Sequence, residues 1–365
     1  MKGAADPAVK WAVTTAEPLP QAGARYQWRR RLGWGPPFVP FSRRQRYDPG
    51  AVMDGARSVL TAAVPYWHPH SGPGGISRSS RGQDYHHVVR ARVRQILTDL
   101  AGEDAAARAH IQSDSGPLEE RAFALKSGLG YLGYNAALFV PPYGSWVFLG
   151  MAVTDAVIEG DDRPLGQLSD CLQCADCIRA CPTGALFAPH RVNPYRCLSY
   201  LTQKRGFLPV ALRRAFGGRI FGCDSCQDAC PVNAEAQRGI AAFVPDEVDR
   251  RCDPVSILQM SRSEFELEWA GKNAGWRGRQ TLRRNAVIAL ANTGRREHIQ
   301  VLAECLDDAS PVIRGHAAWA LAELAARTEQ MLSANTRARL IRLATKDEDS
   351  RVRLEAGRAI VTKDG

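Results

Sequence analysis

Two runs of cysteines constrain this 365-residue chain more than any other feature. The first run has the spacing Cys-x2-Cys-x2-Cys-x3-Cys-Pro, and the second, Cys-x2-Cys-x3-Cys-Pro, follows one further cysteine. These cysteines are Cys171, Cys174, Cys177, Cys181, Cys197, Cys223, Cys226 and Cys230. Eight thiols with this spacing predict two 4Fe–4S clusters, each held by four thiolates. Cys252 and Cys305 lie outside the pattern and are predicted to be buried thiols.

The first run is that of bacterial ferredoxins, in which the fourth cysteine binds the other cluster. The spacing therefore predicts that ligands are exchanged between the runs. One cluster is predicted on Cys171, Cys174, Cys177 and Cys230, and the other on Cys181, Cys197, Cys223 and Cys226. Zinc is the competing interpretation of a Cys-x2-Cys pair. Two Cys-x3-Cys-Pro endings and a count of eight thiols favour iron and sulfur.

The composition is that of a globular protein, with 45% hydrophobic and 24% charged residues. The length predicts two or three domains. No apolar run reaches the ~18 residues that span a bilayer, and the first fifteen residues lack the apolar stretch of a signal peptide. We therefore expect a cytoplasmic protein without a membrane partner. In the cytoplasm, cysteines bind metals more often than they form disulfides.

Three regions predict an α+β protein of three domains. Residues 1–165 alternate between helical and strand periodicity and predict a mixed α/β domain. Its expected strands are 57–67, 107–112, 136–140 and 146–154, and its expected helices are 86–100 and 119–127. Residues 166–245 are rich in Cys, Pro and Gly and predict a ferredoxin-like domain that carries both clusters. Residues 246–365 predict an all-α domain.

The C-terminal region contains three similar segments, 282–291, 313–322 and 352–361, each with an Arg three residues before an Ala. The arginines, Arg283, Arg314 and Arg353, are 31 and 39 residues apart. Helical segments that recur at this interval are typical of HEAT-like repeats. An ordinary helical bundle is the alternative.

The net charge of +10 is distributed unevenly. Residues 18–47 contain seven arginines and no acid, and residues 270–296 contain six arginines, one lysine and no acid. Such stretches are typical of surfaces that bind a phosphate backbone. Two solvated basic faces are the equally simple alternative.

Two further motifs are excluded as cofactor sites. Residues 128–133 (GLGYLG) match Gly-x-Gly-x-x-Gly, but a dinucleotide site needs a strand before the motif and a helix after it. Here the predicted order is the reverse. Asp84-Tyr-His86 is similar to the Asp-x-His-x-x-Gly loop that supplies a histidine ligand to cobalamin in some mutases. Val89 replaces the glycine of that loop, so we do not predict a cobalt ligand there.

Several strings in one order resemble the epoxyqueuosine reductase family over nearly the whole chain. They are 114–117 (DSGP), 128–135 (GLGYLGYN), 143–150 (YGSWVFLG), 196–201 (RCLSYL) and 219–231 (RIFGCDSCQDACP), together with the first cysteine run and the repeat tail. The resemblance implies an N-terminal domain that binds cobalamin, clusters that pass electrons to it, and a tail that binds tRNA. The implied reaction is the two-electron reduction of epoxyqueuosine to queuosine at the wobble position of tRNA. An external low-potential electron donor and a monomeric enzyme are expected.

The resemblance also implies site residues. Asp114 matches the proposed proton donor of the family, which would need a raised pKa under an apolar corrin face. The alternative role for a lone Asp at this position is to cap the following helix. Residues implied to contact cobalamin are Ser77, Arg78, Asp114, Asn135, Ser145 and Trp146.

Two other functions remain open at this point. A corrinoid reductive dehalogenase would also combine cobalamin with two clusters. A protein without catalytic activity, either an electron carrier or a scaffold, would combine ferredoxin clusters with a repeat arm. A bound corrinoid would separate both enzymes from the non-catalytic protein.

Overall fold

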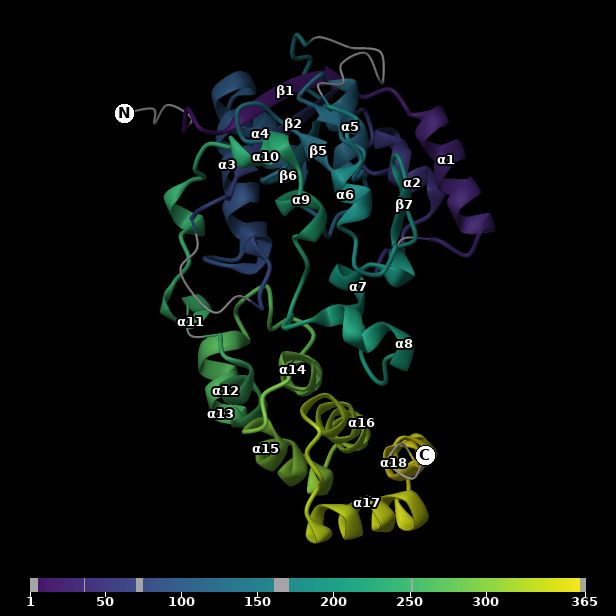
Figure 1. Cartoon of the computed structure of the whole chain (residues 1–365). Helices are drawn as coiled ribbons and strands as arrows, with labels where there is room; N and C mark the ends of the chain where they lie inside the picture. The colour runs from purple at the N-terminus through teal and green to yellow at the C-terminus, as the bar shows by residue number, and fades with distance from the viewer. Residues whose placement is uncertain (1–5, 36, 70–74, 161–170, 251, 362–365) are drawn as a thin grey trace. The chain divides into compact units, whose positions relative to one another are not determined.

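The computed structural model describes residues 6–35, 37–69, 75–160, 171–250 and 252–361 (Figure 1). The chain forms two compact units. Unit 1 consists of residues 1–70, 81–197 and 224–245, and unit 2 consists of residues 71–80, 198–223 and 246–365. The predicted boundary between residues 165 and 166 lies outside the described residues. The predicted cluster domain is divided, because its residues 198–223 belong to unit 2.

Apolar and ionic contacts explain why residues 198–223 join the C-terminal helices. Leu201 and Phe216 are buried in the same core as Leu282. Arg213 also donates two hydrogen bonds to Glu355, at 2.6 and 3.0 Å, and both side chains are buried. A buried ion pair is costly to break, because the remaining charge has no compensation.

Unit 1 contains an antiparallel sheet with the strand order β1-β2-β6-β3. These strands are β1 (Lys10–Thr15), β2 (Ser58–Pro65), β3 (His110–Gln112) and β6 (Val147–Thr154). Every residue of β2 is buried, since one apolar cluster contains Leu60 and a second contains Val59. A strand covered on both faces has a nearly continuous apolar sequence, and this explains the run that predicted it.

The longer helices of unit 1 are α1 (Pro20–Arg31), α2 (Arg43–Tyr47), α3 (Tyr85–Ala101), α4 (Glu103–Arg108) and α5 (Glu120–Lys126). Helix α3 confirms the predicted helix at 86–100, and its Val89 and Val93 are fully buried. The helix packs closely on β6, because a Cβ at Gly150 would lie 2.4 Å from the Val89 side chain. Glycine is therefore required at this contact.

Smaller elements complete unit 1 and correct two predictions. They are β4 (Tyr131–Leu132), β5 (Leu138–Phe139), β7 (Leu186–Ala188), β8 (Arg191–Val192), α6 (Asp176–Arg179), α9 (Ser225–Asp228) and α10 (Pro231–Ala234). The strand expected at 107–112 is shorter, since α4 extends to Arg108 and β3 begins at His110. The strand expected at 136–140 is reduced to β5. The glycine string 128–133 follows helix α5 and contains β4, so a helix precedes it and the exclusion of a dinucleotide site stands.

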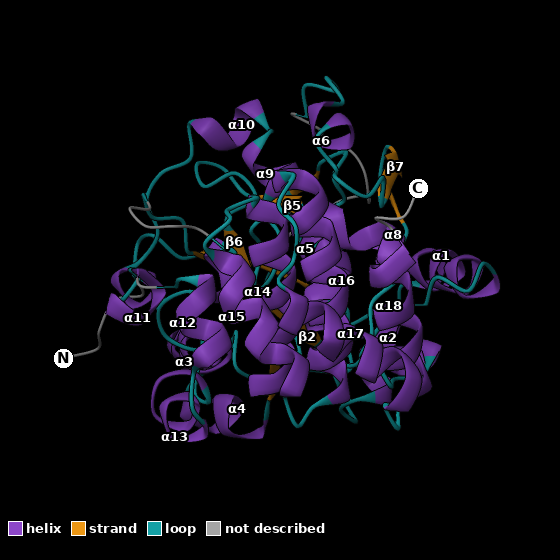
Figure 2. Cartoon of the chain, turned by 60° about the horizontal axis from the view of Figure 1, so that its bottom comes forward, coloured by secondary structure: helices purple, strands orange, loops and turns teal. Residues whose placement is uncertain are grey.

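Unit 2 is helical. Its α-helices are α7 (Leu198–Gln203), α8 (Val210–Arg213), α11 (Glu247–Arg250), α12 (Pro254–Gln259), α13 (Arg262–Glu264), α14 (Arg279–Thr293), α15 (His298–Glu304), α16 (Pro311–Thr328), α17 (Ala334–Lys346) and α18 (Ser350–Val361). Between residues 252 and 361 every regular element is a helix (Figure 2). Helices α14 and α16 supply much of the core, in which Ala286, Ile313 and Ala317 are fully buried.

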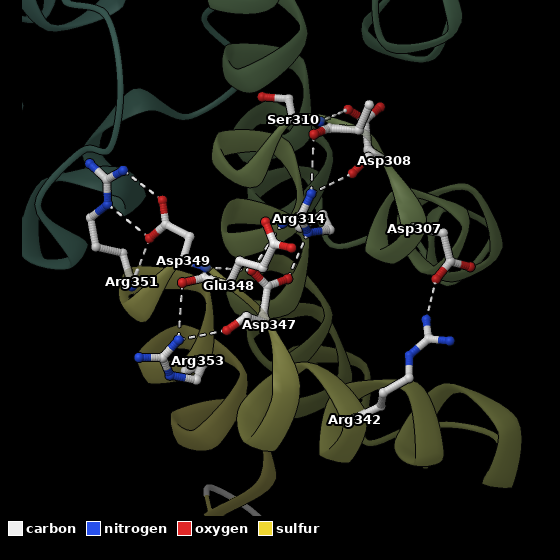
Figure 3. Close-up of polar contacts among 11 residues, drawn as sticks. Asp307, Asp308, Ser310, Arg314, Arg342, Asp347, Glu348, Asp349, Arg351 and Arg353 are labelled. Carbon is white, nitrogen blue, oxygen red and sulfur yellow. Dashed lines mark hydrogen bonds and ion pairs between the residues drawn. The ribbon is translucent and has the colours of Figure 1, made fainter.

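Two of the three recurring arginines, Arg283 and Arg314, join one repeat to the next. Arg283 of α14 donates to Asp308, which precedes α16, at 2.6 Å. Arg314 of α16 donates to both carboxylate oxygens of Asp347, which precedes α18, at 2.8 and 2.9 Å. Figure 3 shows that Arg314 also bonds the backbone oxygen of Asp308, and that Arg353 bonds the backbone oxygen of Asp347. The sequence period therefore reflects an ionic ladder along the helices.

Candidate functional site

Four cysteines of unit 1 surround one pocket. Cys171, Cys174 and Cys177 come from the segment that forms α6, and Cys230 directly precedes α10. These are the four thiols that the exchanged spacing assigns to one cluster. Burial raises the pKa of Cys177 and Cys230, and nearby thiols of the same group raise it further. Iron would be needed to keep such thiols deprotonated, as metal binding requires.

The arrangement suits a cluster better than a single ion. Among the described residues, no three His, Cys, Asp or Glu side chains are placed to hold one metal ion. Zinc needs thiolates at ~2.3 Å from a common centre. In a 4Fe–4S cluster each of the four irons takes a different thiolate, so the thiols lie around a cavity.

The remaining cysteines divide into two sets. Cys181, Cys197 and Cys226 belong to unit 1, whereas Cys223 belongs to unit 2, and their grouping around a second cluster stays a prediction. Cys181 accepts a hydrogen bond from the backbone nitrogen of Leu186 at 3.4 Å. The prediction that Cys252 and Cys305 are buried is confirmed.

Asp114 lies in the loop after β3, and its side chain is 71% exposed. Its carboxylate oxygen Oδ2 accepts a hydrogen bond from the Tyr85 hydroxyl at 2.8 Å and lies 3.8 Å from His86 Nε2. The following helix begins at Glu120 with Glu119 as N-cap. The capping role considered for Asp114 is therefore wrong.

His86 lies between two carboxylates. Its Nδ1 is 2.7 Å from Asp84 Oδ1, while its Nε2 faces Asp114. Asp84 is the N-cap of α3, because its side chain accepts from the backbone nitrogen of His86 at 2.9 Å. Asp114, supported by Asp84, raises the pKa of His86 above 6.5. The sequence showed this Asp-Tyr-His triplet, but its relation to Asp114 depends on the tertiary fold.

The pKa values of Asp114 and its neighbour Glu120 are shifted in opposite directions. His86 and then Tyr85 lower the pKa of Asp114, so the expected raised pKa is not produced by the protein's own residues. Burial instead raises the pKa of Glu120 to about 7. Glu120 accepts a hydrogen bond from Gln112 at 2.6 Å, and the charge of Asp114 also raises its pKa. Glu120 is a second candidate acid that the sequence analysis missed.

Two of the residues implied to contact cobalamin are bonded inside unit 1. Asn233 donates to Ser145 Oγ at 2.8 Å and accepts from the Ser145 backbone nitrogen, also at 2.8 Å. Trp146 is buried, and its indole nitrogen donates to the backbone oxygen of Asn233 at 3.4 Å. Ser145 and Trp146 thus hold Asn233 of α10, directly after Cys230. These bonds explain why both residues are buried, and no ligand is needed to explain it.

The other implied contacts lie in different surroundings. Asn135 lines the pocket of the four cysteines, and its side chain accepts from the backbone nitrogen of Ala137 at 3.1 Å. Ser77 and Arg78 belong to unit 2, where the Ser77 hydroxyl lies 3.1 Å from that of Ser80. Asn135 and Asp114 lie in unit 1, whereas Ser77 and Arg78 lie in unit 2, so a contact of all four with one ligand stays a prediction.

Two arginines near Asp114 offer hydrogen-bond donors to a ligand. Arg90 donates to Ser115 at 2.7 Å, and Arg46 donates to Glu119 at 3.3 Å. Within the described residues, the buried Nε atom of each arginine has no hydrogen-bond partner. A corrin has peripheral amide oxygens that could accept from such donors. The residues around Asp114 therefore fit a polar ligand of this kind.

Some arginines of the second basic stretch, residues 270–296, are bonded inside the protein and are not exposed to a phosphate. Arg283 is used in the repeat ladder, and Arg284 is fully buried with its guanidinium on backbone oxygens of Leu201 and Gly206. Burial lowers the pKa of Arg284 to about 9. A cavity of about 470 Å³ in unit 2 is lined by Arg284 and by four further arginines. They are Arg205, Arg262, Arg277 and Arg279.

Unit 1 contains a pocket of four cysteines and an exposed carboxylate, Asp114, beside His86. Together with the HEAT-like repeats, these features define an iron–sulfur protein with an acid–base site. Three family models match: 4Fe-4S double cluster binding domain at 170–233, Epoxyqueuosine reductase QueG, DUF1730 at 46–115, and HEAT repeats at 277–361. The epoxyqueuosine reductase of Bacillus subtilis (strain 168) is 31% identical over 98% of this chain and 93% of its own length. The chain belongs to the epoxyqueuosine reductase family.

Solved structures support the same conclusion. An epoxyqueuosine reductase with an epoxyqueuosine-modified stem loop of tRNA-Tyr matches with a TM-score of 0.86 and 30% identity, over 97% of this chain and 94% of that one. A Bacillus subtilis epoxyqueuosine reductase in which the catalytic aspartate loop is swung out of the active site matches with a TM-score of 0.85, at the same identity and coverage. The HEAT prediction is confirmed, and neither a dehalogenase nor a scaffold is indicated. No described helix is both long and apolar enough to span a membrane.

Proposed function

We propose that this protein reduces epoxyqueuosine to queuosine in tRNA. The observation that carries the proposal is Asp114, an exposed carboxylate bonded to Tyr85 and close to His86, in the same unit as the pocket of four cysteines. One solved relative has a catalytic aspartate on a loop, and Asp114 is also a loop residue. Asp114 is the proposed donor of a proton to the epoxide oxygen.

Cobalamin is the proposed cofactor, held by Arg46, Arg90 and the loop of Asp114. Their spare guanidinium donors and the exposure of Asp114 support this site. Ser77, Arg78 and Asn135 remain candidate contacts, whereas Ser145 and Trp146 are omitted because they bond Asn233. Bound cobalamin supplies a low-valent metal centre that can transfer two electrons to the substrate.

Two 4Fe–4S clusters are the proposed electron path into this site. The first is assigned to the pocket of Cys171, Cys174, Cys177 and Cys230. The second is assigned to Cys181, Cys197, Cys223 and Cys226. Each cluster carries one electron at a time, so an external low-potential donor must act twice for each epoxide reduced. A cytoplasmic, monomeric enzyme is proposed.

The RNA partner is proposed to contact unit 2 through the arginine-lined cavity. The modified base must leave the anticodon stack to be reduced, as in other enzymes that act on one nucleotide. Such an enzyme needs phosphate contacts that hold the loop while the base is displaced. Arg205 and Arg262 are exposed beside the cavity and suit this role better than Arg283 or Arg284.

The double variant Arg205→Gln/Arg262→Gln should weaken binding of an anticodon stem loop. Each lost phosphate contact should lower the slope of log affinity against log salt by about 0.7–0.9. Fluorescence titrations at several salt concentrations measure this slope. Arg342→Gln/Arg351→Gln is the matched control, because it removes the same charge from arginines already paired with Asp307 and Asp349. Equal slope changes in both double variants would show that only net charge matters.

The direct test of the function uses purified protein with its clusters, added cobalamin, a strong one-electron reductant and an epoxyqueuosine stem loop. Mass spectrometry of the nucleosides should show queuosine, formed with loss of one oxygen atom. The same change should fail to occur in tRNA of a strain from which the gene is deleted. Protein that contains both clusters and a corrinoid, yet leaves epoxyqueuosine unchanged, would refute the proposal.

A further inference from the structure

Asp84, His86 and Asp114 form a line of acid–base groups in unit 1, with a hydrogen bond between the first two and a longer ion-pair contact between the last two. The imidazole is 2.7 Å from Asp84 on one side and 3.8 Å from Asp114 on the other. Tyr85 fixes the orientation of Asp114, because its ring stacks on Phe148 at 4.2 Å and its hydroxyl bonds the carboxylate. The exposed fraction is 71% for Asp114, 27% for His86 and 32% for Asp84. The line therefore runs from an open carboxylate to two half-buried groups.

The proposed reaction requires two protons. Reduction of an epoxide to an alkene breaks both carbon–oxygen bonds and takes up two electrons, and the oxygen leaves as water only if it gains two protons. The electrons come from the external one-electron donor through the clusters. Asp114 can carry only one proton at a time, so it must be protonated again before the oxygen can leave.

We propose that His86 is the proton donor to Asp114, and that Asp84 holds its imidazole in position for this transfer. In each of two successive transfers, a proton passes from His86 Nε2 to Asp114 Oδ2 and then to the substrate oxygen. His86 becomes neutral after each transfer and takes a proton back from solvent, so that two protons reach the oxygen before it leaves as water. The inference rests on the proposed function, since it assigns the source of protons for that reaction.

The charges around His86 are consistent with this direction of transfer. Asp114 and Asp84 raise the pKa of His86, which favours the protonated imidazole that the transfer requires. Before substrate binds, His86 and Tyr85 keep the pKa of Asp114 low. A substrate that covers the exposed carboxylate would disfavour its charge and raise its pKa. The proton would then move from His86 to Asp114.

Other charged groups bear on Asp114 and not directly on His86. Arg46 lowers the pKa of Asp114 by its charge, and Arg90 bonds the adjacent Ser115. Glu120 is a further carboxyl near Asp114, with a pKa of about 7 that its burial produces. Glu120 could accept a proton from solvent independently of His86, so the test includes Glu120→Gln as a separate variant.

The first measurement is independent of activity. In cluster-loaded protein without cobalamin, NMR follows the imidazole resonance of His86 against pH, assigned by its loss in His86→Gln. Asp114→Asn should lower the pKa of His86, because the variant removes the carboxylate charge nearest to Nε2. The resonance of His87, the exposed neighbour on the same helix, is the internal control in that variant. An unchanged pKa of His86 would overturn the proposed line.

The second measurement is the single-turnover rate as a function of pH. In the wild type the rate should fall as pH rises through the raised pKa of His86, since the proton donor is lost there. His86→Ala should be slower by about 100-fold, the lower end of general acid effects, and should lose this pH dependence. Added imidazole should restore part of the rate, because the site is open at Asp114. His87→Ala is the matched control and should retain the wild-type profile.

These outcomes separate the proton transfer from His86 to Asp114, here called the relay, from the proposed function. If the wild type makes no queuosine at any pH, the function fails, while the NMR coupling between His86 and Asp114 can still be present. If the wild type is active and His86→Ala keeps its rate and pH profile, the relay is overturned. If Glu120→Gln removes the pH dependence and His86→Ala does not, the proton comes from Glu120, and the relay is again overturned.

Discussion

Asp114→Asn should lower single-turnover formation of queuosine by about 10²–10⁴-fold, which is the usual effect of removing a positioned general acid. Asparagine keeps the shape of the side chain and can still accept the hydrogen bond that Tyr85 donates at 2.8 Å. It cannot pass a proton to the substrate oxygen. Iron content, cobalamin content and melting temperature should remain near those of the wild type, because Asp114 is 71% exposed and caps no helix.

Two variants test the assignment of Asp114. Asp155→Asn makes the same chemical change at an exposed ion pair with Arg108, and it should have little effect, since such pairs contribute little to stability. Glu120→Gln removes the carboxyl whose pKa burial raises to about 7. If Glu120→Gln stops turnover while Asp114→Asn stays within a few-fold of the wild type, Glu120 is the acid and the assignment of Asp114 is wrong.

The pattern of apolar residues was sufficient to predict elements whose burial follows from their own sequence. The apolar run of β2 and the spacing of Val89 and Val93 in α3 each identified an element that the structure confirms. Short strands were predicted less well. The segment 107–112 has no periodicity that separates the last turn of α4 from β3, and the pairing of His110 with Val153 of β6 defines where that strand begins.

The acid–base site was only partly predictable. Asp114 came from a resemblance, but its partner His86 lies 28 residues earlier in sequence, and the fold alone brings the two together. The pKa of Asp114 is expected to rise under an apolar corrin face, whereas the protein's own His86 and Tyr85 lower it. Charge counting failed for Arg283 and Arg284, which were grouped with exposed arginines although both are buried. The sequence shows which charged residues are present, whereas their burial and their partners in the fold decide which of them can bind a ligand.

The cysteine spacing makes the sharpest remaining prediction, namely that Cys230 belongs with the other run. Anaerobically purified protein should contain about eight irons and eight acid-labile sulfides, by the rule of four thiolates for each 4Fe–4S cluster. Cys230→Ala should lower both numbers towards about four, because one ligand of the pocket is lost. Cys305→Ala is the control, since this buried thiol bonds the backbone oxygen of Val301 and should not affect iron content.

Paramagnetic resonance of the reduced variants identifies the cluster that is lost. If ligands are exchanged, the spectrum of Cys230→Ala should match that of Cys171→Ala, although these cysteines belong to different runs. It should differ from the spectrum of Cys226→Ala, although Cys226 belongs to the same run. Queuosine formation should cease in all three variants, because each interrupts the electron path. A match between Cys230→Ala and Cys226→Ala would contradict the exchange, and tightly bound zinc without labile sulfide would contradict the clusters themselves.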